Sequence, residues 1–191
     1  MGKQLFKIAM AATVGMVALS LRGETVYQVS GSGNFSYYTP SEYGDEIVLG
    51  GSGRILTEFK FEYFSNYNFA QGISFNLYDQ SGPTVSGSKA PGTLLYSTKL
   101  DLYDGGGIVS LSFPEDPANT VADRLTWTVK FSGAGFGNNK AGLIVPNATP
   151  TVGKSGNDFW VRTGAGQADW ALQNFGPGGP TANFVATVSA V

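Results

Sequence analysis

The chain has 191 residues, a length that fits one domain. It contains no cysteine and no histidine, which excludes Ser-His-Asp and Cys-His triads and zinc sites built on thiolate or imidazole ligands. Charged residues make up only 14% and the formal net charge is -2, which argues against a nucleic-acid partner. Aromatic residues at 13% indicate a packed core rather than a disordered chain.

The first twenty residues have the pattern of a secretory signal peptide. Lys3 and Lys7 give a positive start, residues 8–19 carry no charge, and small residues precede the exit at Ser20. This apolar run is shorter than the ~20 residues of a membrane span. We therefore expect export, with cleavage after Ser20 or, alternatively, after Gly23; a buried helix or a retained anchor is the other interpretation. The expected location is extracellular or at the cell surface, with the periplasm as an alternative.

Removal of residues 1–20 would sharpen the composition of the remaining domain, 21–191. All three methionines lie in the leader, and the loss of two lysines leaves 10 basic against 14 acidic residues, a net charge of -4. Without thiol, thioether or imidazole, the domain has neither a soft metal site nor a proton shuttle near neutral pH, which favours a durable exterior module over an enzyme. No second apolar stretch of membrane length follows, so we expect no transmembrane segment in the mature chain.

Alternation with a period of two, typical of strands with one buried face, dominates the chain from residue 54 onward. It predicts strands at 54–64, 72–79, 109–113, 125–131 and 184–188, and shorter ones at 47–49, 93–99, 141–145, 159–162 and 170–175. Glycine and proline clusters between these runs predict chain reversals. We expect an all-β fold, a two-sheet antiparallel sandwich of jelly-roll-like form with about nine or ten strands, and a closed barrel is the alternative. Residues 21–45 are less periodic and are expected to form an irregular lead-in or an edge strand of this single domain.

Seven segments carry a resemblance to known proteins: GDEIVL (44–49), TEFKFEYF (57–64), PGTLLYS (91–97), LTWTVKFSG (125–133), AGLI (141–144), TVGKS (151–155) and NDFW (157–160). In this order they resemble a group of uncharacterised exported bacterial β-sandwich proteins, many of which end in a PEP-CTERM surface-sorting tail. The resemblance spans roughly residues 43–188. It implies a β-sandwich and an exported location, but no activity and no catalytic residues. The Val-Pro-Glu-Pro signal, apolar helix and basic end of that tail are absent here, so this sorting route gains no support.

Asp101 and Asp104 are the candidate metal ligands. They precede three glycines, and carboxylates and backbone carbonyls are the ligands that a structural calcium ion prefers. The segment does not match the loop of an EF-hand, and a solvated turn with its charges outward is the simpler interpretation. We expect no required cofactor.

Two tryptophans carry different expectations. Trp127 lies in an alternating apolar run and is expected in the core. In 158–162 the alternation would turn Trp160 and Arg162 outward, where an indole could stack on a sugar ring. Packing of Trp160 beneath a loop is the alternative. Such a ligand-binding platform would also include Tyr37, Tyr38 and Tyr43.

These observations favour a non-catalytic exported module of the cell surface or extracellular matrix that binds glycan or another envelope component. The alternative is a self-associating subunit of a filament, sheath or surface layer, whose polar, aromatic N-terminal segment would add to a neighbour's sheet edge. A secreted hydrolase is a distant third hypothesis. Glycoside hydrolysis needs carboxylates about 5–10 Å apart, whereas Glu58 and Glu62 would lie ~13 Å apart along an extended strand.

Overall fold

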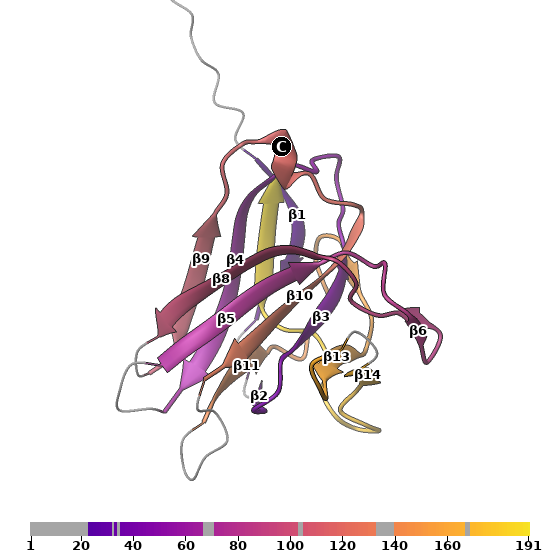
Figure 1. Ribbon diagram of the computed structural model, residues 1–191. Coiled ribbons are helices and arrows are strands. Elements are labelled where there is room, and N and C mark those ends of the chain that lie inside the picture. Colours follow the sequence, from indigo (N-terminus) through magenta and orange to yellow (C-terminus); the bar gives the residue numbers. More distant parts are fainter. Residues whose placement is uncertain are drawn as a thin grey trace, which may run out of the picture.

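The computed structural model describes residues 23–31, 33, 35–66, 71–102, 105–132, 140–166 and 169–191. Within them the chain forms two β-sheets packed face to face, the antiparallel sandwich that the alternation predicts (Figure 1). The expected leader, residues 1–20, lies outside the described residues, so its role stays a prediction. No helix in the described ranges is long and apolar enough to cross a membrane.

The described residues form fifteen strands, more than the nine or ten predicted, and one short 3-10 helix, η1. In chain order these are β1 (Glu24–Val29), β2 (Phe35–Tyr37), β3 (Tyr43–Val48), β4 (Leu56–Ser65), β5 (Gln71–Tyr78), β6 (Thr84–Val85), β7 (Ser88–Lys89), β8 (Leu94–Leu102), β9 (Gly107–Ser112), η1 (Pro117–Asn119), β10 (Arg124–Phe131), β11 (Ala141–Val145), β12 (Lys154–Ser155), β13 (Phe159–Arg162), β14 (Trp170–Gln173) and β15 (Ala186–Ala190).

Eight of these strands form a jelly roll. Sheet A has the order β1-β15-β4-β9, and sheet B has the order β3-β10-β5-β8. Every neighbouring pair in the two orders is antiparallel. The chain crosses between the sheets in the sequence that gives two Greek keys, which is the predicted jelly-roll form.

The segment between β10 and β15 adds strands to both sheets. β11 lies beside the far end of β4 and pairs with β2 in sheet A, while β13 and β14 extend sheet B beyond β3. Figure 1 shows β13 and β14 beside β3, at the edge of sheet B opposite β8. β6, β7 and β12 have two residues each, too few for an alternation to reveal them.

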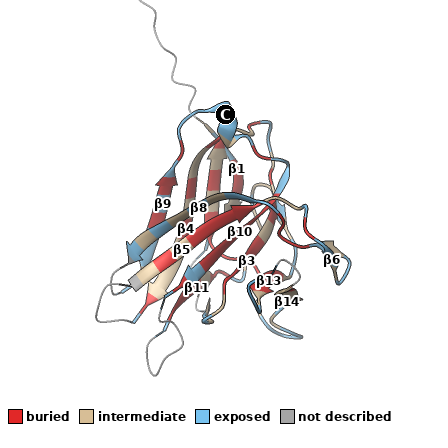
Figure 2. Ribbon diagram, in the orientation of Figure 1, coloured by how far each residue is buried: buried red, intermediate tan, exposed pale blue. Residues whose placement is uncertain are grey.

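The core fills the space between the sheets and is rich in aromatic rings. Phe59 and Phe61 of β4 lie 5.3 Å and 5.7 Å from the ring of Trp127 on β10, measured between centroids. Trp127 has no exposed surface, which confirms its expected place in the core. Figure 2 shows buried residues along the strands of both sheets, with exposed residues in the connecting loops and on the edge strands β8 and β9.

Strands β1 and β2 of the N-terminal segment pair with other strands of the same domain. β1 pairs with β15 at the edge of sheet A, and β2 pairs with β11. On the other side of β1, the N–H of Gln28 donates to the carbonyl of Val152 at 3.0 Å, and the N–H of Thr151 donates to the carbonyl of Gln28 at 2.8 Å. The segment is therefore paired within the domain, with β1 as an edge strand of sheet A; its addition to a neighbour's sheet edge stays a prediction. A register shift between Thr25 and Tyr27 breaks the alternation of β1, which explains why this segment is less periodic than the later strands.

Candidate functional site

The outer face of sheet B carries polar side chains that are buried. Thr126 and Thr128 of β10 have no exposed surface, and Asn76 of β5 is 9% exposed. Alternation correctly turns these residues away from the core, but it does not predict that the outer face is covered. Buried polar groups need hydrogen-bond partners, so the partners show what is built on this face.

Glu42, directly before β3, is the centre of the network. One carboxylate oxygen, Oε1, accepts hydrogen bonds from the Asn76 amide at 2.8 Å, the Tyr78 hydroxyl at 2.8 Å and the Thr128 hydroxyl at 2.6 Å. Burial raises the pKa of Tyr78, and the charge of Glu42 raises it further, so the Tyr78 hydroxyl remains a donor at neutral pH. Glu42 itself is only 8% exposed, and its charge is compensated by these donors and by Arg162.

Arg162, at the end of β13, is the cationic partner of Glu42. Its Nη1 donates to Oε2 of Glu42 at 3.2 Å, and its Nη2 donates to the carbonyl of Ala165 at 2.6 Å. The guanidinium lies over the ring of Trp170, 5.4 Å from the centroid. The backbone N–H of Arg162 donates to the carbonyl of Glu42 at 2.8 Å. The guanidinium is therefore fixed from several directions before any ligand arrives.

A pocket of about 460 Å³ lies over this pair. Its volume is within the range of roughly 300–1,000 Å³ that is usual for small-molecule sites. Its described lining residues are Pro40, Ser41, Glu42, Lys130, Arg162, Thr163, Gly164 and Ala165. They come from the segment before β3, the end of β10 and the loop after β13, so the pocket lies where the added strands meet the jelly roll.

The wall formed by 163–166 is held in shape by Asp169. The N–H of Thr163 donates to the carbonyl of Asp169 at 2.8 Å, and its hydroxyl donates to the same carbonyl at 2.7 Å. The Asp169 carboxylate accepts from the N–H of Gly166. A Cβ at Gly164 would come too close to Oδ2 of that carboxylate, so a larger residue here would shift the Asp169 side chain that holds the wall. The wall is a shaped turn, pre-formed around the guanidinium.

The structure does not give Trp160 the exposed role expected for it. Trp160 lies on the outer face of sheet B, as the alternation predicts, but its side chain has no exposed surface. It forms a second apolar cluster with Tyr78, Ala90 and Trp170, against which Val85 of the β6–β7 hairpin packs. Trp160 is thus packed inside this cluster, and the alternative interpretation, a buried rather than an exposed indole, is the one observed.

The three tyrosines do not form a shared platform. Tyr43 is fully buried in the core. Tyr37 is half-buried and lies edge-to-face against Tyr43 and Phe159, with centroids 5.1 Å and 4.8 Å apart. Only Tyr38 is substantially exposed, at 40%, and the Lys140 ammonium lies 4.9 Å from its ring. Of the five predicted ligand-binding residues, the structure places only Arg162 in the pocket.

The predicted calcium ligands cannot be compared with each other. Asp101 lies exposed on β8, whereas Asp104 falls outside the described residues. Across the ranges that the structure describes, no three acidic, histidine or cysteine side chains gather in a group suited to a metal ion. A structural calcium ion at these residues stays a prediction.

Glu42 and Lys130 are the pocket residues that sequence reasoning missed. The partners of Glu42 are 34 to 120 positions away along the chain, on β5, β10 and β13. A single glutamate before a strand gives no local signal of such a network. Lys130 alternates with buried residues and was expected only to face outward, which it does.

Comparisons with protein-family models, with curated proteins and with solved structures found no match for this chain.

Proposed function

We propose that the protein is a non-catalytic, exported module of the cell surface or extracellular matrix, and that it binds glycan in the pocket over Glu42 and Arg162. The observation that carries this proposal is the pre-formed pocket, whose polar floor is fixed by the hydrogen bonds of Glu42 and Arg162. Sugars bind through several hydrogen bonds at once, and a floor that is already ordered loses little entropy on binding.

The hydrogen bonds that the Glu42 carboxylate already accepts favour a role in binding over a role in catalysis. Glu42 accepts hydrogen bonds from Asn76, Tyr78, Thr128 and Arg162, which hold it in place as an ionic anchor. A general acid or base must instead exchange a proton with a substrate within hydrogen-bond reach. We therefore propose that Glu42 organises the site. A secreted hydrolase remains the distant alternative.

The test is glycan binding by the purified protein, using an oligosaccharide array followed by titration calorimetry. Ala165 is exposed on the pocket wall, so Ala165→Trp is expected to fill the pocket and abolish retention without disturbing Glu42. Ala122→Trp is the matched control, because Ala122 is also exposed but lies before β10, at the end opposite Lys130. Equal binding by both variants, or no retention of any glycan by the unmodified protein, would contradict the proposal.

Exposed apolar side chains at two sheet edges favour a second candidate, self-association into a filament, sheath or surface layer. Ile108 on β9 is 66% exposed, and Leu94 and Leu95 on β8 are about half-exposed. β9 and β8 are edge strands of the jelly-roll sheets, and edges with apolar side chains are prone to pair with another chain. Sedimentation at rising protein concentration tests this candidate. Ile108→Lys places a charged ammonium opposite Glu62 on the exposed edge and should abolish assembly. An unmodified protein that stays monomeric at all concentrations would argue against self-association.

A further inference from the structure

The pocket offers ligands mainly hydrogen-bond donors, and this imbalance points to the chemistry of its ligand. Its described carboxylate, Glu42, already accepts hydrogen bonds from four side chains. The guanidinium of Arg162 has five N–H donors: Nη1 and Nη2 each use one, on Glu42 and Ala165, and Nε is buried, which leaves one N–H on each Nη for a ligand. Donors that lack protein acceptors favour a ligand rich in acceptor oxygens.

Lys130 adds a second positive charge to the pocket lining. It is exposed at the end of β10, and no carboxylate of the described residues lies within ion-pair distance of its ammonium. The described lining residues therefore carry two cations against the single anion of Glu42. The nearby Asp169 is not one of the described lining residues, and its carboxylate accepts a hydrogen bond from the N–H of Gly166. In a chain with a formal net charge of -2, this positive lining is a local exception.

We propose that the pocket selects acidic sugars, whose oxyanion lies between Lys130 and Arg162. This inference rests on the proposed glycan-binding function and names the class of glycan. A carboxylate or a sulfate ester supplies the same oxyanion chemistry. The planar guanidinium fork suits either group, and the Lys130 ammonium contributes a mobile point charge. Ser41, another lining residue, adds a hydroxyl that can contact the neutral part of the ring.

The experiment compares three oligosaccharides built from sugars of galactose configuration: neutral galactan oligomers, the same oligomers carrying sulfate esters, and galacturonate oligomers. Titration at two salt concentrations measures affinity for the purified protein. We expect either acidic ligand to bind at least about tenfold more tightly than the neutral one, with affinity that falls as salt rises. The ratio between the two acidic ligands identifies the preferred anion, and a preference for either one supports the inference.

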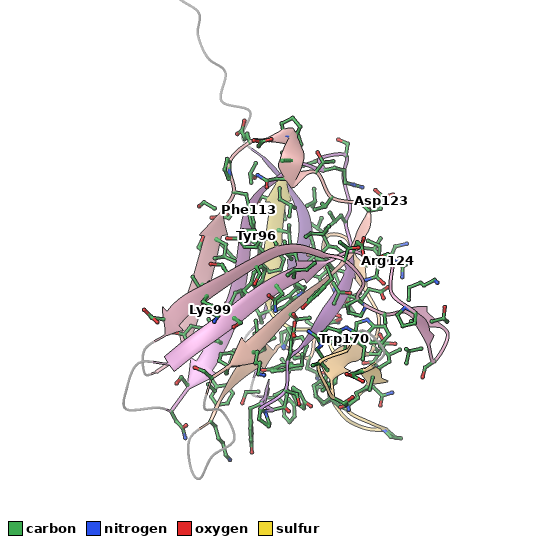
Figure 3. All side chains as sticks on the ribbon, in the orientation of Figure 1. Tyr96, Lys99, Phe113, Asp123, Arg124 and Trp170 are labelled. Atoms are coloured by element: carbon green, nitrogen blue, oxygen red, sulfur yellow. The ribbon has the colours of Figure 1, made fainter. Side chains whose placement is uncertain are left out.

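Lys130→Gln is the decisive variant, because Lys130 is exposed and its removal should leave the fold intact. We expect the affinity for the acidic ligand to fall by about 3- to 10-fold and its salt dependence to flatten. Lys99→Gln is the matched control, since Lys99 is exposed on β8 at the opposite edge of sheet B, well away from Trp170 (Figure 3).

Three outcomes would overturn the inference. Equal affinity for neutral and acidic oligomers, or equal effects of Lys130→Gln and Lys99→Gln, would refute charge selection while leaving glycan binding in place. No binding of any of the three oligomers would refute the acidic-sugar inference, and the proposed function as well if no glycan on the array is retained. Thermal unfolding of each variant confirms that a lost affinity does not reflect a lost fold.

Discussion

The hydroxyl of Tyr43, in sheet B, accepts a hydrogen bond from the backbone N–H of Leu143, in sheet A, at 3.0 Å. The same hydroxyl donates to the carbonyl of Tyr37 at 2.8 Å. Because the ring of Tyr43 is fully buried, this hydroxyl links the two sheets across the core. Burial raises the pKa of Tyr43, so the hydroxyl keeps the proton that it donates.

Tyr43→Phe is expected to destabilise the protein by about 1–3 kcal/mol, the usual cost of leaving buried polar groups unpaired. The variant keeps the ring, but the Leu143 N–H loses its acceptor and the Tyr37 carbonyl loses a donor. Denaturant unfolding measures the change. Tyr38→Phe is the control, because Tyr38 is exposed and should shift the midpoint little. An unchanged midpoint for Tyr43→Phe would mean that the link between the sheets contributes nothing.

Asp45 on β3 is a buried carboxyl between the sheets, with no exposed surface. The hydroxyl of Ser155 donates to its two oxygens at 2.8 Å and 2.9 Å. Burial raises the pKa of Asp45 well above its usual range, and the charges of Asp158 and Glu46 raise it further. The protonated, neutral form is therefore favoured in the folded protein.

This raised pKa predicts a loss of stability as pH increases. The folded state binds the Asp45 proton more tightly than the unfolded state, so the stabilisation is fully present below the ordinary pKa of 3.8 and is lost as pH rises through the folded pKa. Asp45→Asn, which is neutral at every pH, should be more stable than the original protein near neutral pH and similar to it at low pH. Unfolding free energies measured across this window test the prediction, and parallel curves for the two proteins would contradict it.

Sequence patterns predict the jelly roll because its strands are long enough to alternate. On β10 they correctly separate Trp127, in the core, from Thr128 on the outer face. They cannot predict what covers an outer face, since that depends on residues distant in sequence. Trp160 is buried because it packs in a cluster with Tyr78 and Ala90, which lie about 70–80 positions earlier in the chain.

Sequence reasoning predicts only part of the candidate site, because the residues that build it are distant from one another in the sequence. The alternation in 159–162 places Arg162 outward, and the structure brings it to the pocket. Glu42 acquires its role only when three separate strands, β5, β10 and β13, fold around it. Local periodicity cannot predict hydrogen bonds to residues that are distant in sequence, because any polar residue before a strand would fit the same pattern.

Glu42 is expected to be the most sensitive residue of the site. Glu42→Leu removes the shared acceptor of Asn76, Tyr78 and Thr128 and leaves the Arg162 guanidinium without its carboxylate. Breaking a buried ionic network in this way costs about 3–5 kcal/mol. Glu42→Gln keeps the shape and one acceptor oxygen, so we expect a smaller loss. Thermal and denaturant unfolding of both variants measure the difference, and a Glu42→Leu variant as stable as Glu42→Gln would show that the network is not coupled through this carboxylate.

Glu24 predicts a pH dependence of the opposite sign. Its Oε1 accepts hydrogen bonds from the backbone N–H groups of Ser52 and Gly53, at 2.6 Å and 2.5 Å. These bonds lower the pKa of Glu24 below its ordinary 4.5. The folded state then binds the proton less tightly than the unfolded state, so the stabilisation is present above about pH 4.5 and is lost as pH falls.

Glu24→Gln should therefore be less stable than the original protein at neutral pH, with a difference that shrinks as pH falls below about 4.5. Glutamine keeps the length of the side chain but loses the charge that the two N–H groups favour. Glu62→Gln is the control, a surface glutamate on β4. Because Glu24 is exposed, high salt should reduce the effect of Glu24→Gln. A constant difference between the variant and the original protein from low to neutral pH would show that the loop 51–53 does not depend on the charge of Glu24.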